Sequence, residues 1–233
     1  MTEYESLVES LRIAYGDEFS KMATIIKGNE NTPLYHISFD DKIKSFVPRF
    51  STKLVNGESR AIPRTSTSSS ILGCMLGFGD IGRGYLNNAF DSKRDNTLYI
   101  YKMEYGLAVK PSKDLVPDVD YTDEHWLIAS SVKTREYKGQ ITGRGFLSNI
   151  GIDLLRNGCI YNYIWYFSLD EKTKFIKGLD LEPGCYRINL LDIGGYDFIP
   201  KVGDNIKVEK ITKDEFLFHE GRRIESISNK RLY

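Results

Sequence analysis

Directly after Pro33 the chain runs Leu34-Tyr35-His36-Ile37-Ser38-Phe39. Apolar and polar side chains alternate along this stretch, which predicts a half-buried β-strand that begins after a turn. Because successive side chains of a strand point to opposite faces, His36 shares one face with Leu34, and the other apolar side chains share the opposite face. A histidine placed in this way either presents its imidazole to a groove or is satisfied by a hydrogen bond inside the sheet.

The composition is that of an ordinary globular protein. Of the 233 residues, 41% are hydrophobic and 27% are charged, which is enough to bury a core in one large domain or two small ones. The 32 basic and 32 acidic residues cancel, which excludes a protein-wide basic field for nucleic acid but not a local patch. The chain has no apolar run of about 18 residues and no secretory signal at its start. We therefore expect a cytoplasmic protein without a membrane-spanning segment.

The cysteines indicate thiols rather than disulfides or metal ligands. Cys74, Cys159 and Cys185 are far apart and lie in apolar surroundings. An odd number without CxxC or Cys/His spacing predicts buried thiols of a cytosolic protein and no metal site.

The segments on either side of the histidine strand suggest helices before it and a long loop after it. Residues 4–27 carry apolar side chains at helical spacing, interrupted at Gly16-Asp17, which predicts two short helices or one kinked helix. Residues 40–63 are polar and contain prolines, which predicts a loop of about 20 residues, a length typical of functional or mobile segments. Three arginines lie in or beside this loop and fit either a solvated surface or a lip that faces an anion: Arg49, Arg60 and Arg64.

Residues 64–76 predict a strand that turns into a helix. Arg64-Thr65-Ser66-Thr67 is β-branched and follows a proline, whereas Ser68-Ser69-Ser70 supplies N-cap candidates for an apolar run at 71–76. Such a turn brings hydroxyl groups and a helix N-terminus together and can cradle a phosphate, although serine caps are common without any ligand. The glycine-rich stretch 77–84 follows a helix without βαβ context, so it does not predict a Rossmann fold.

The chain from residue 97 onward predicts mostly strands. Glu124 directly precedes one of them, a position at which glutamates are usually solvated. The predicted strands are 97–103, 125–129, 133–141, 159–167, 185–191 and 198–211, with a loop between the first two and one helix at 146–157. The aromatic strand 159–167 can either stack on bases or pack in a core.

Three of these motifs, in this order, resemble the signature of ADP-ribosyltransferases of the His-Tyr-Glu type. They are the strand with His36, the strand-to-helix segment 64–76, and Glu124 before a strand that continues into a hairpin; together they span residues 34–141. The sequence departs from the family at the tyrosine of the middle motif, where Arg64, Ser66 or Thr67 stands instead.

The resemblance implies an α+β fold. It implies an ADP-ribosyltransferase-like split antiparallel sheet with flanking helices in residues 1–142, followed by a β-rich accessory domain in residues 143–233. It also implies NAD as a substrate, with Glu124 as the catalytic carboxylate that stabilises positive charge on the ribose and His36 as a catalytic residue that also positions NAD. The other residues expected to bind NAD are Ser38, Arg64, Ser66 and Thr67.

The resulting expectation is an NAD-dependent ADP-ribosyltransferase that modifies a protein or nucleic-acid target. Because Lys, Asn, Ile and Tyr are plentiful, an AT-rich bacterial or phage genome is compatible, and by analogy the protein is expected to be a toxin or effector. The alternative is a non-catalytic protein on the same scaffold that captures a nucleotide signal or a protein partner, which the absent tyrosine favours. A third possibility is a related enzyme that removes a phosphate from RNA ends with NAD.

Overall fold

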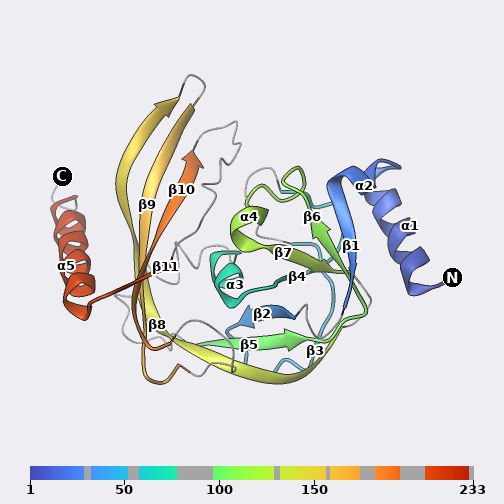
Figure 1. Ribbon diagram of the computed structural model, residues 1–233, viewed down its shortest axis with the longest axis horizontal. Coiled ribbons are helices and arrows are strands. Elements are labelled where there is room, and N and C mark those ends of the chain that lie inside the picture. Colours follow the sequence, from blue (N-terminus) through green and yellow to red (C-terminus); the bar gives the residue numbers. More distant parts are fainter. Residues whose placement is uncertain are drawn as a thin grey trace. The chain divides into compact units, whose positions relative to one another are not determined.

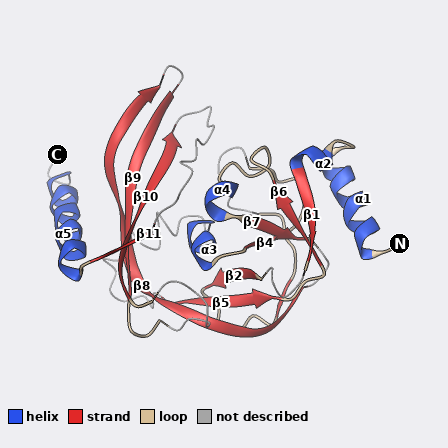
Figure 2. Cartoon of the chain, in the orientation of Figure 1, coloured by secondary structure: helices blue, strands red, loops and turns tan. Residues whose placement is uncertain are grey.

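The protein has an α+β fold built on antiparallel strand pairs (Figure 1; Figure 2). The chain forms two compact units: residues 1–79 with 98–139, and residues 80–97 with 140–233. The change from one unit to the other at 139/140 falls within β8 (Val132–Leu155), as does the sequence-based boundary at 142/143. The computed structural model describes residues 1–28, 33–51, 58–77, 97–128, 132–155, 158–173, 182–194 and 208–230.

The first unit combines short helices with a sheet. Its helices are α1 (Glu3–Tyr15), α2 (Phe19–Met22), α3 (Ile71–Gly77) and α4 (Val119–Thr122). Its strands are β1 (Ala23–Lys27), β2 (Leu34–Ser38), β3 (Ser45–Phe46), β4 (Thr65–Ser68), β5 (Thr97–Met103), β6 (Leu107–Pro111) and β7 (Glu124–Leu127). A capping box starts α1, in which the Thr2 hydroxyl accepts from the Glu5 N–H and the Glu5 carboxylate accepts from the Thr2 N–H.

The strands of this unit follow the order β1-β6-β7-β4-β2-β5, and each pair of neighbours is antiparallel. β4 runs alongside β7 from Thr65 opposite Leu127 to Ser68 opposite Glu124, whereas β2 meets β4 at the pair Tyr35 and Ser68. The order brings three segments that are far apart in sequence onto adjacent strands: the histidine strand, the serine-rich strand and the strand that begins at Glu124.

Within the described part of the first unit, two apolar clusters stabilise the fold. In the first cluster α1 contributes Leu7 and Leu11, which pack with Val109 of β6 and Trp126 of β7. The second cluster contains Leu34 of β2 together with Phe46, Tyr101, Met103, Ala108 and Leu127. Because both clusters contain residues of β7, the strand that carries Glu124 is held in the core of the unit.

The second unit is a meander of strands with a C-terminal helix. Its elements are the end of β8, then β9 (Gly158–Leu169), β10 (Gly184–Gly194), β11 (Val208–Ile211) and α5 (Lys213–Lys230). Neighbours in the order β8-β9-β10-β11 pair antiparallel. Phe216 of α5 packs with Phe146 and Tyr166, and Arg187 of β10 forms ion pairs with Glu209 of β11 at 2.7 Å and Glu215 of α5 at 2.9 Å.

Several sequence-based predictions are confirmed. The general α+β class holds, and strands form at 34–38, 65–68, 97–103, 124–127, 158–169 and 184–194. The interruption at Gly16-Asp17 does separate two helices, because Gly16 ends α1 with a φ of 79° that favours glycine.

Other predictions are wrong. The predicted helix at 146–157 is part of strand β8 as far as Leu155, and the last residues of the predicted helical region 4–27 form strand β1. The predicted loops contain β3, β6 and α4, and helix α5 was not predicted. Of the predicted strand 198–211, only Val208–Ile211 lies within the described residues, where it forms β11.

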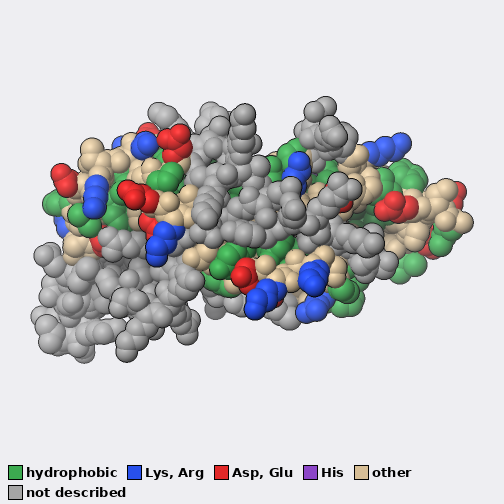
Figure 3. All heavy atoms as spheres, turned by 90° about the horizontal axis from the view of Figure 1, so that it is seen from below, with side chains coloured by type: hydrophobic (Ala, Val, Ile, Leu, Met, Phe, Trp, Pro, Cys, Tyr) green, Lys and Arg blue, Asp and Glu red, His purple; other side chains and the backbone are tan. Residues whose placement is uncertain are grey.

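The described surface mixes charges of both signs. On the face seen in Figure 3, lysine and arginine side chains lie among aspartate and glutamate side chains. Among the described helices, none is both long and apolar enough to cross a membrane.

Candidate functional site

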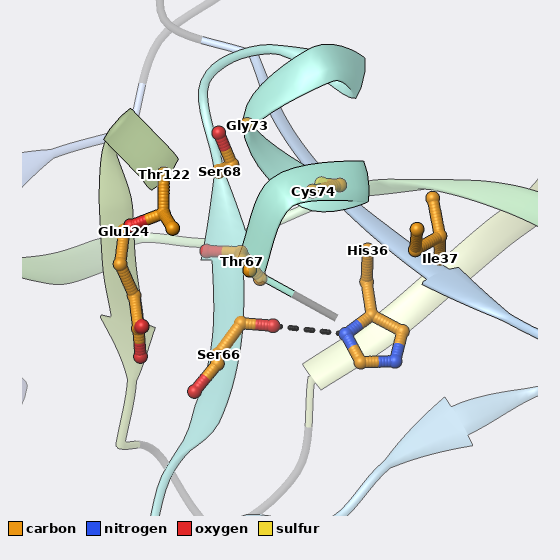
Figure 4. A pocket seen from close by; sticks show the side chains of 10 residues that line it. His36, Ile37, Ser66, Thr67, Ser68, Gly73, Cys74, Thr122 and Glu124 are labelled. Carbon is orange, nitrogen blue, oxygen red and sulfur yellow. Dashed lines mark hydrogen bonds between the residues drawn. The ribbon is translucent and has the colours of Figure 1, made fainter. Parts of the chain in front are cut away.

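The first unit contains a cavity of about 120 Å³ between β2, β4, α3 and the junction of α4 with β7 (Figure 4). This volume exceeds the roughly 30 Å³ that one water occupies and lies below the roughly 300–1,000 Å³ of typical ligand pockets. The side chains and glycines that line it are His36, Ile37, Ser66, Thr67, Ser68, Gly73, Cys74, Gly77, Thr122 and Glu124. Four of the residues predicted from the sequence therefore meet here: His36, Ser66, Thr67 and Glu124.

The imidazole of His36 is fixed in orientation. Its Nδ1 lies 2.9 Å from the backbone oxygen of Ser66 on β4 (Figure 4). The ring of Phe46 packs against the imidazole in an edge-to-face arrangement, with 4.5 Å between the ring centres. Burial lowers the pKa of His36, which favours the neutral ring. Because a carbonyl oxygen only accepts, Nδ1 carries the hydrogen, and Nε2 of the neutral ring is left as an acceptor.

Glu124 is the first residue of β7, and both of the contacts described below are made to one oxygen of its carboxylate, Oε1. Side chains two apart on a strand share a face, so the indole of Trp126 lies beside Glu124 and its Nε1–H donates to Oε1 at 2.8 Å. Nε of Arg64 lies 3.8 Å from the same oxygen. The Glu124 side chain is 12% exposed and lines the cavity, so it is not the solvated rim carboxylate that is usual at such a position.

Arg64 does not lie in the cavity wall. Its side chain is 1% exposed, forms an ion pair with Glu58, donates from Nη1 to the backbone oxygen of Ser59 at 2.9 Å, and stacks on Trp126 with 4.4 Å from Cζ to the ring centre. A guanidinium buried and engaged in this way cannot contact a phosphate, so the expected NAD contact of Arg64 is corrected to a structural role. Arg49 and Arg60 are exposed, which fits the solvated surface and leaves the anion-facing lip without support.

The remaining predicted residues differ in their roles. Ser66 and Thr67 line the cavity, and the Thr67 hydroxyl donates to the backbone oxygen of His125 at 2.9 Å. Ser38 does not line it; the Ser38 hydroxyl accepts instead from the N–H of Asp40 at 3.1 Å.

The serine-rich start of α3 is occupied by its own side chains. The Ser68 hydroxyl accepts from the N–H of Ser70 at 3.1 Å, and the Ser70 hydroxyl accepts from the N–H of Gly73 at 2.9 Å. These bonds satisfy N–H groups that a phosphate would need. The expected phosphate cradle is therefore not formed, and the serines serve as caps.

Sequence reasoning missed several cavity residues. Cys74 lines the cavity, donates from Sγ to the backbone oxygen of Tyr35 at 3.1 Å, and is so buried that its pKa rises to about 12, which keeps it a thiol. Gly73 lies where α3 approaches the backbone oxygen of Thr122 too closely for a Cβ atom. A glycine inside the apolar run 71–76 was the available signal for this close approach.

Asp118, a partly buried residue, lies directly before helix α4. Burial, followed by the negative charge of Glu124, raises the pKa of Asp118 to about 6.

Among the described residues no group of His, Cys, Asp and Glu side chains is arranged to hold a metal ion. Comparisons of the chain with protein-family models, with curated proteins and with solved structures find no match.

The cavity wall therefore combines two hydrogen-bond acceptors from distant parts of the sequence. A neutral imidazole and a carboxylate, 88 positions apart in the sequence from 36 to 124, line one cavity together with hydroxyl groups and the Cys74 thiol. The carboxylate can also stabilise a positive charge that develops on a bound molecule, because fixed negative charge in a partly buried site is screened little by water.

Proposed function

We propose that the protein is an NAD-dependent ADP-ribosyltransferase that modifies a macromolecular target, with an ADP-ribosyltransferase-like sheet in its first unit. The observation that carries the proposal is that His36 and Glu124 line the same cavity. The adjacency of β2, β4 and β7 supports it further, because these strands carry the three motifs on which the resemblance rests.

In the proposed reaction the bond between the ribose C1′ and the nicotinamide nitrogen breaks, and its electron pair neutralises the pyridinium ring. Positive charge develops on the ribose, and the Glu124 carboxylate stabilises it in the transition state. A nucleophilic atom of the target then forms a bond to C1′ and releases its proton to the carboxylate or to solvent. ADP-ribosyl target and nicotinamide are the products.

The site fits one part of NAD rather than the whole molecule. A cavity of about 120 Å³ has room for a sugar or a single ring, so the rest of the dinucleotide would lie outside it. The acceptor Nε2 of His36 suits a ribose hydroxyl, which can donate to it. The hydroxyl groups of Ser66 and Ser68 are further polar groups in the wall.

A second candidate function is a non-catalytic protein that captures a nucleotide signal or a protein partner. One observation favours it: the place of the family's stacking tyrosine is taken by residues without an aromatic ring. Ser66 and Thr67 supply only hydroxyl groups there, and that of Thr67 is already bonded to His125. Without ring stacking, a bound nicotinamide would be oriented less firmly for transfer.

The test is incubation of the full chain with radiolabelled NAD and a cell lysate, with wild type compared with Glu124→Ala. Transfer of label by wild type and its loss in Glu124→Ala support the transferase. The matched control is Glu171→Ala, which removes an exposed carboxylate of the second unit and is expected to transfer label as wild type does.

Thermal unfolding with NAD separates the two candidates. No label transfer together with a melting temperature raised by NAD or ADP-ribose supports the binding protein. We expect His36→Ala to weaken nucleotide binding, while Glu124→Ala mainly lowers turnover. Neither transfer nor a change in melting temperature with either nucleotide would overturn the transferase and the capture of a nucleotide signal.

A further inference from the structure

We propose that Trp126 and Arg64 are positioning residues for Glu124: together they hold its Oε1 and leave Oε2 to the cavity. The inference rests on the proposed function of Glu124, and goes beyond it by assigning roles to two residues outside the cavity wall.

Trp126 is a rigid donor. It is fully buried, lies opposite Val109 of β6 and Ser66 of β4, and packs with Leu7 and Leu11 of α1. The ring of Tyr15 stacks on it with 6.4 Å between ring centres. An indole enclosed on so many sides cannot turn, so the 2.8 Å bond from Nε1 to Oε1 of Glu124 has a fixed direction.

Arg64 supports both partners of that bond. Its guanidinium stacks on the Trp126 ring and is itself anchored by Glu58 and the backbone oxygen of Ser59. Nε of Arg64 is buried without a hydrogen-bond partner in the described part of the chain. It lies 3.8 Å from Oε1, which is too long for a hydrogen bond but close enough for attraction between the charges.

Both contacts converge on one oxygen. Oε2 of Glu124 has no hydrogen-bond partner among the described residues, and the side chain lines the cavity. A carboxylate fixed through one oxygen keeps the other at a defined place, which is the preorganisation that stabilisation of a developing charge requires. The direct prediction is that a substitution of the Glu124 carboxylate changes the environment of the Trp126 indole N–H.

The chain has two tryptophans, and they form a natural pair for an NMR experiment. Trp165 is equally buried, but its Nε1 has no hydrogen-bond partner in the described part of the chain. In a ¹H–¹⁵N spectrum the two indole signals are assigned with Trp126→Phe and Trp165→Phe. We expect Glu124→Gln to move the Trp126 indole signal upfield by several line widths, because a charge-assisted bond becomes a neutral one, while the Trp165 signal stays in place.

The kinetic arm measures NAD turnover. Trp126→Phe is expected to lower kcat about tenfold with KM changed less than twofold, and to have no further effect in a Glu124→Gln background, because the two residues act as a unit. Arg64→Lys, which keeps the charge, is expected to retain more turnover than Arg64→Met. The Trp165→Phe variant controls for the loss of a buried indole.

The two proposals fail in different ways. Wild-type protein that turns over no NAD in the presence of the cell lysate would overturn the proposed function, whereas the NMR result would still stand. A Trp126 indole signal that Glu124→Gln leaves unmoved, or equal losses of turnover from Trp126→Phe with and without Glu124→Gln, would overturn the positioning role.

Discussion

Replacement of Arg64 by methionine tests whether the buried guanidinium stabilises the first unit. Methionine keeps an unbranched stem of similar reach, so packing over the Trp126 ring is largely retained while the charge is lost. The Arg64 side chain is 1% exposed and that of its partner Glu58 is 9% exposed. Arg64→Met therefore removes the cation that pairs with the largely buried Glu58 carboxylate, and also removes the positive charge that lies near Glu124.

The expected loss of stability follows from this burial. Breaking a buried ion pair by removing one partner costs about 3–5 kcal/mol, because the remaining charge is uncompensated. The lost hydrogen bond to Ser59 and the lost cation–π attraction to Trp126 belong to the same substitution and are not added separately. For a chain of this length 1 kcal/mol shifts the melting temperature by about 2–4 °C, so the expected fall is on the order of 6–20 °C.

Denaturant unfolding and calorimetry measure the effect, with Arg60→Met as the control, because Arg60 is exposed. The double variant Arg64→Met with Glu58→Gln removes both charges and is expected to recover part of the loss. A fall of less than about 1 kcal/mol in the free energy of unfolding, the size typical of exposed pairs, would refute the reasoning. Strict additivity of the two substitutions would do the same.

Two further substitutions probe the surroundings of the site. Gly73→Ala is expected to destabilise the fold by about 1–3 kcal/mol, because its Cβ would overlap the backbone oxygen of Thr122. The control is Gly221→Ala in helix α5, where a Cβ meets nothing within 4 Å. In the same denaturant series this control is expected to stabilise the fold by about 0.5–1 kcal/mol. Asp118→Asn tests a pH dependence: burial and the charge of Glu124 raise the pKa of Asp118 to about 6, above its unfolded value of about 3.9, so the folded state holds the proton more tightly. The stability from this group is present below about pH 4 and is lost as the pH rises through 6. Unfolding free energies of Asp118→Asn relative to wild type should therefore rise on the order of 2 kcal/mol from pH 4 to pH 7, and a flat difference would contradict the assignment.

The strands were predictable where local sequence and tertiary pairing agree. Residues 97–103 and 158–169 are rich in aromatic and β-branched side chains, and both form strands. The prediction of a helix at 146–157 was wrong because short apolar runs fit both the helical and the strand period. Pairing with β9 decides in favour of a strand, with a register shift between Asn149 and Gly151. At β1, Thr24-Ile25-Ile26 favours a strand, and pairing with β6 overrides the helical spacing.

The site was predictable in part. The order of the motifs pointed to a common location for His36 and Glu124, and the strand order β2-β4-β7 brings both to one cavity. Arg64 could not be judged from its neighbours, because an arginine beside a polar loop resembles a surface residue. Its burial depends on Trp126, 62 positions further along the sequence from 64 to 126, and on a carboxylate of the loop itself.

The charges of the cavity wall constrain what it can bind. None of the described residues that line it is lysine or arginine, and the guanidinium of Arg64 is already engaged by Glu58. The wall instead presents the carboxylate of Glu124 and the neutral ring of His36, both of which accept hydrogen bonds. A phosphate would meet repulsion there and no compensating cation, whereas a hydroxyl group, an amide or a developing positive charge would be stabilised. In the proposed complex the pyrophosphate of NAD therefore lies outside the cavity, and the ribose that carries the reacting bond lies within reach of Glu124.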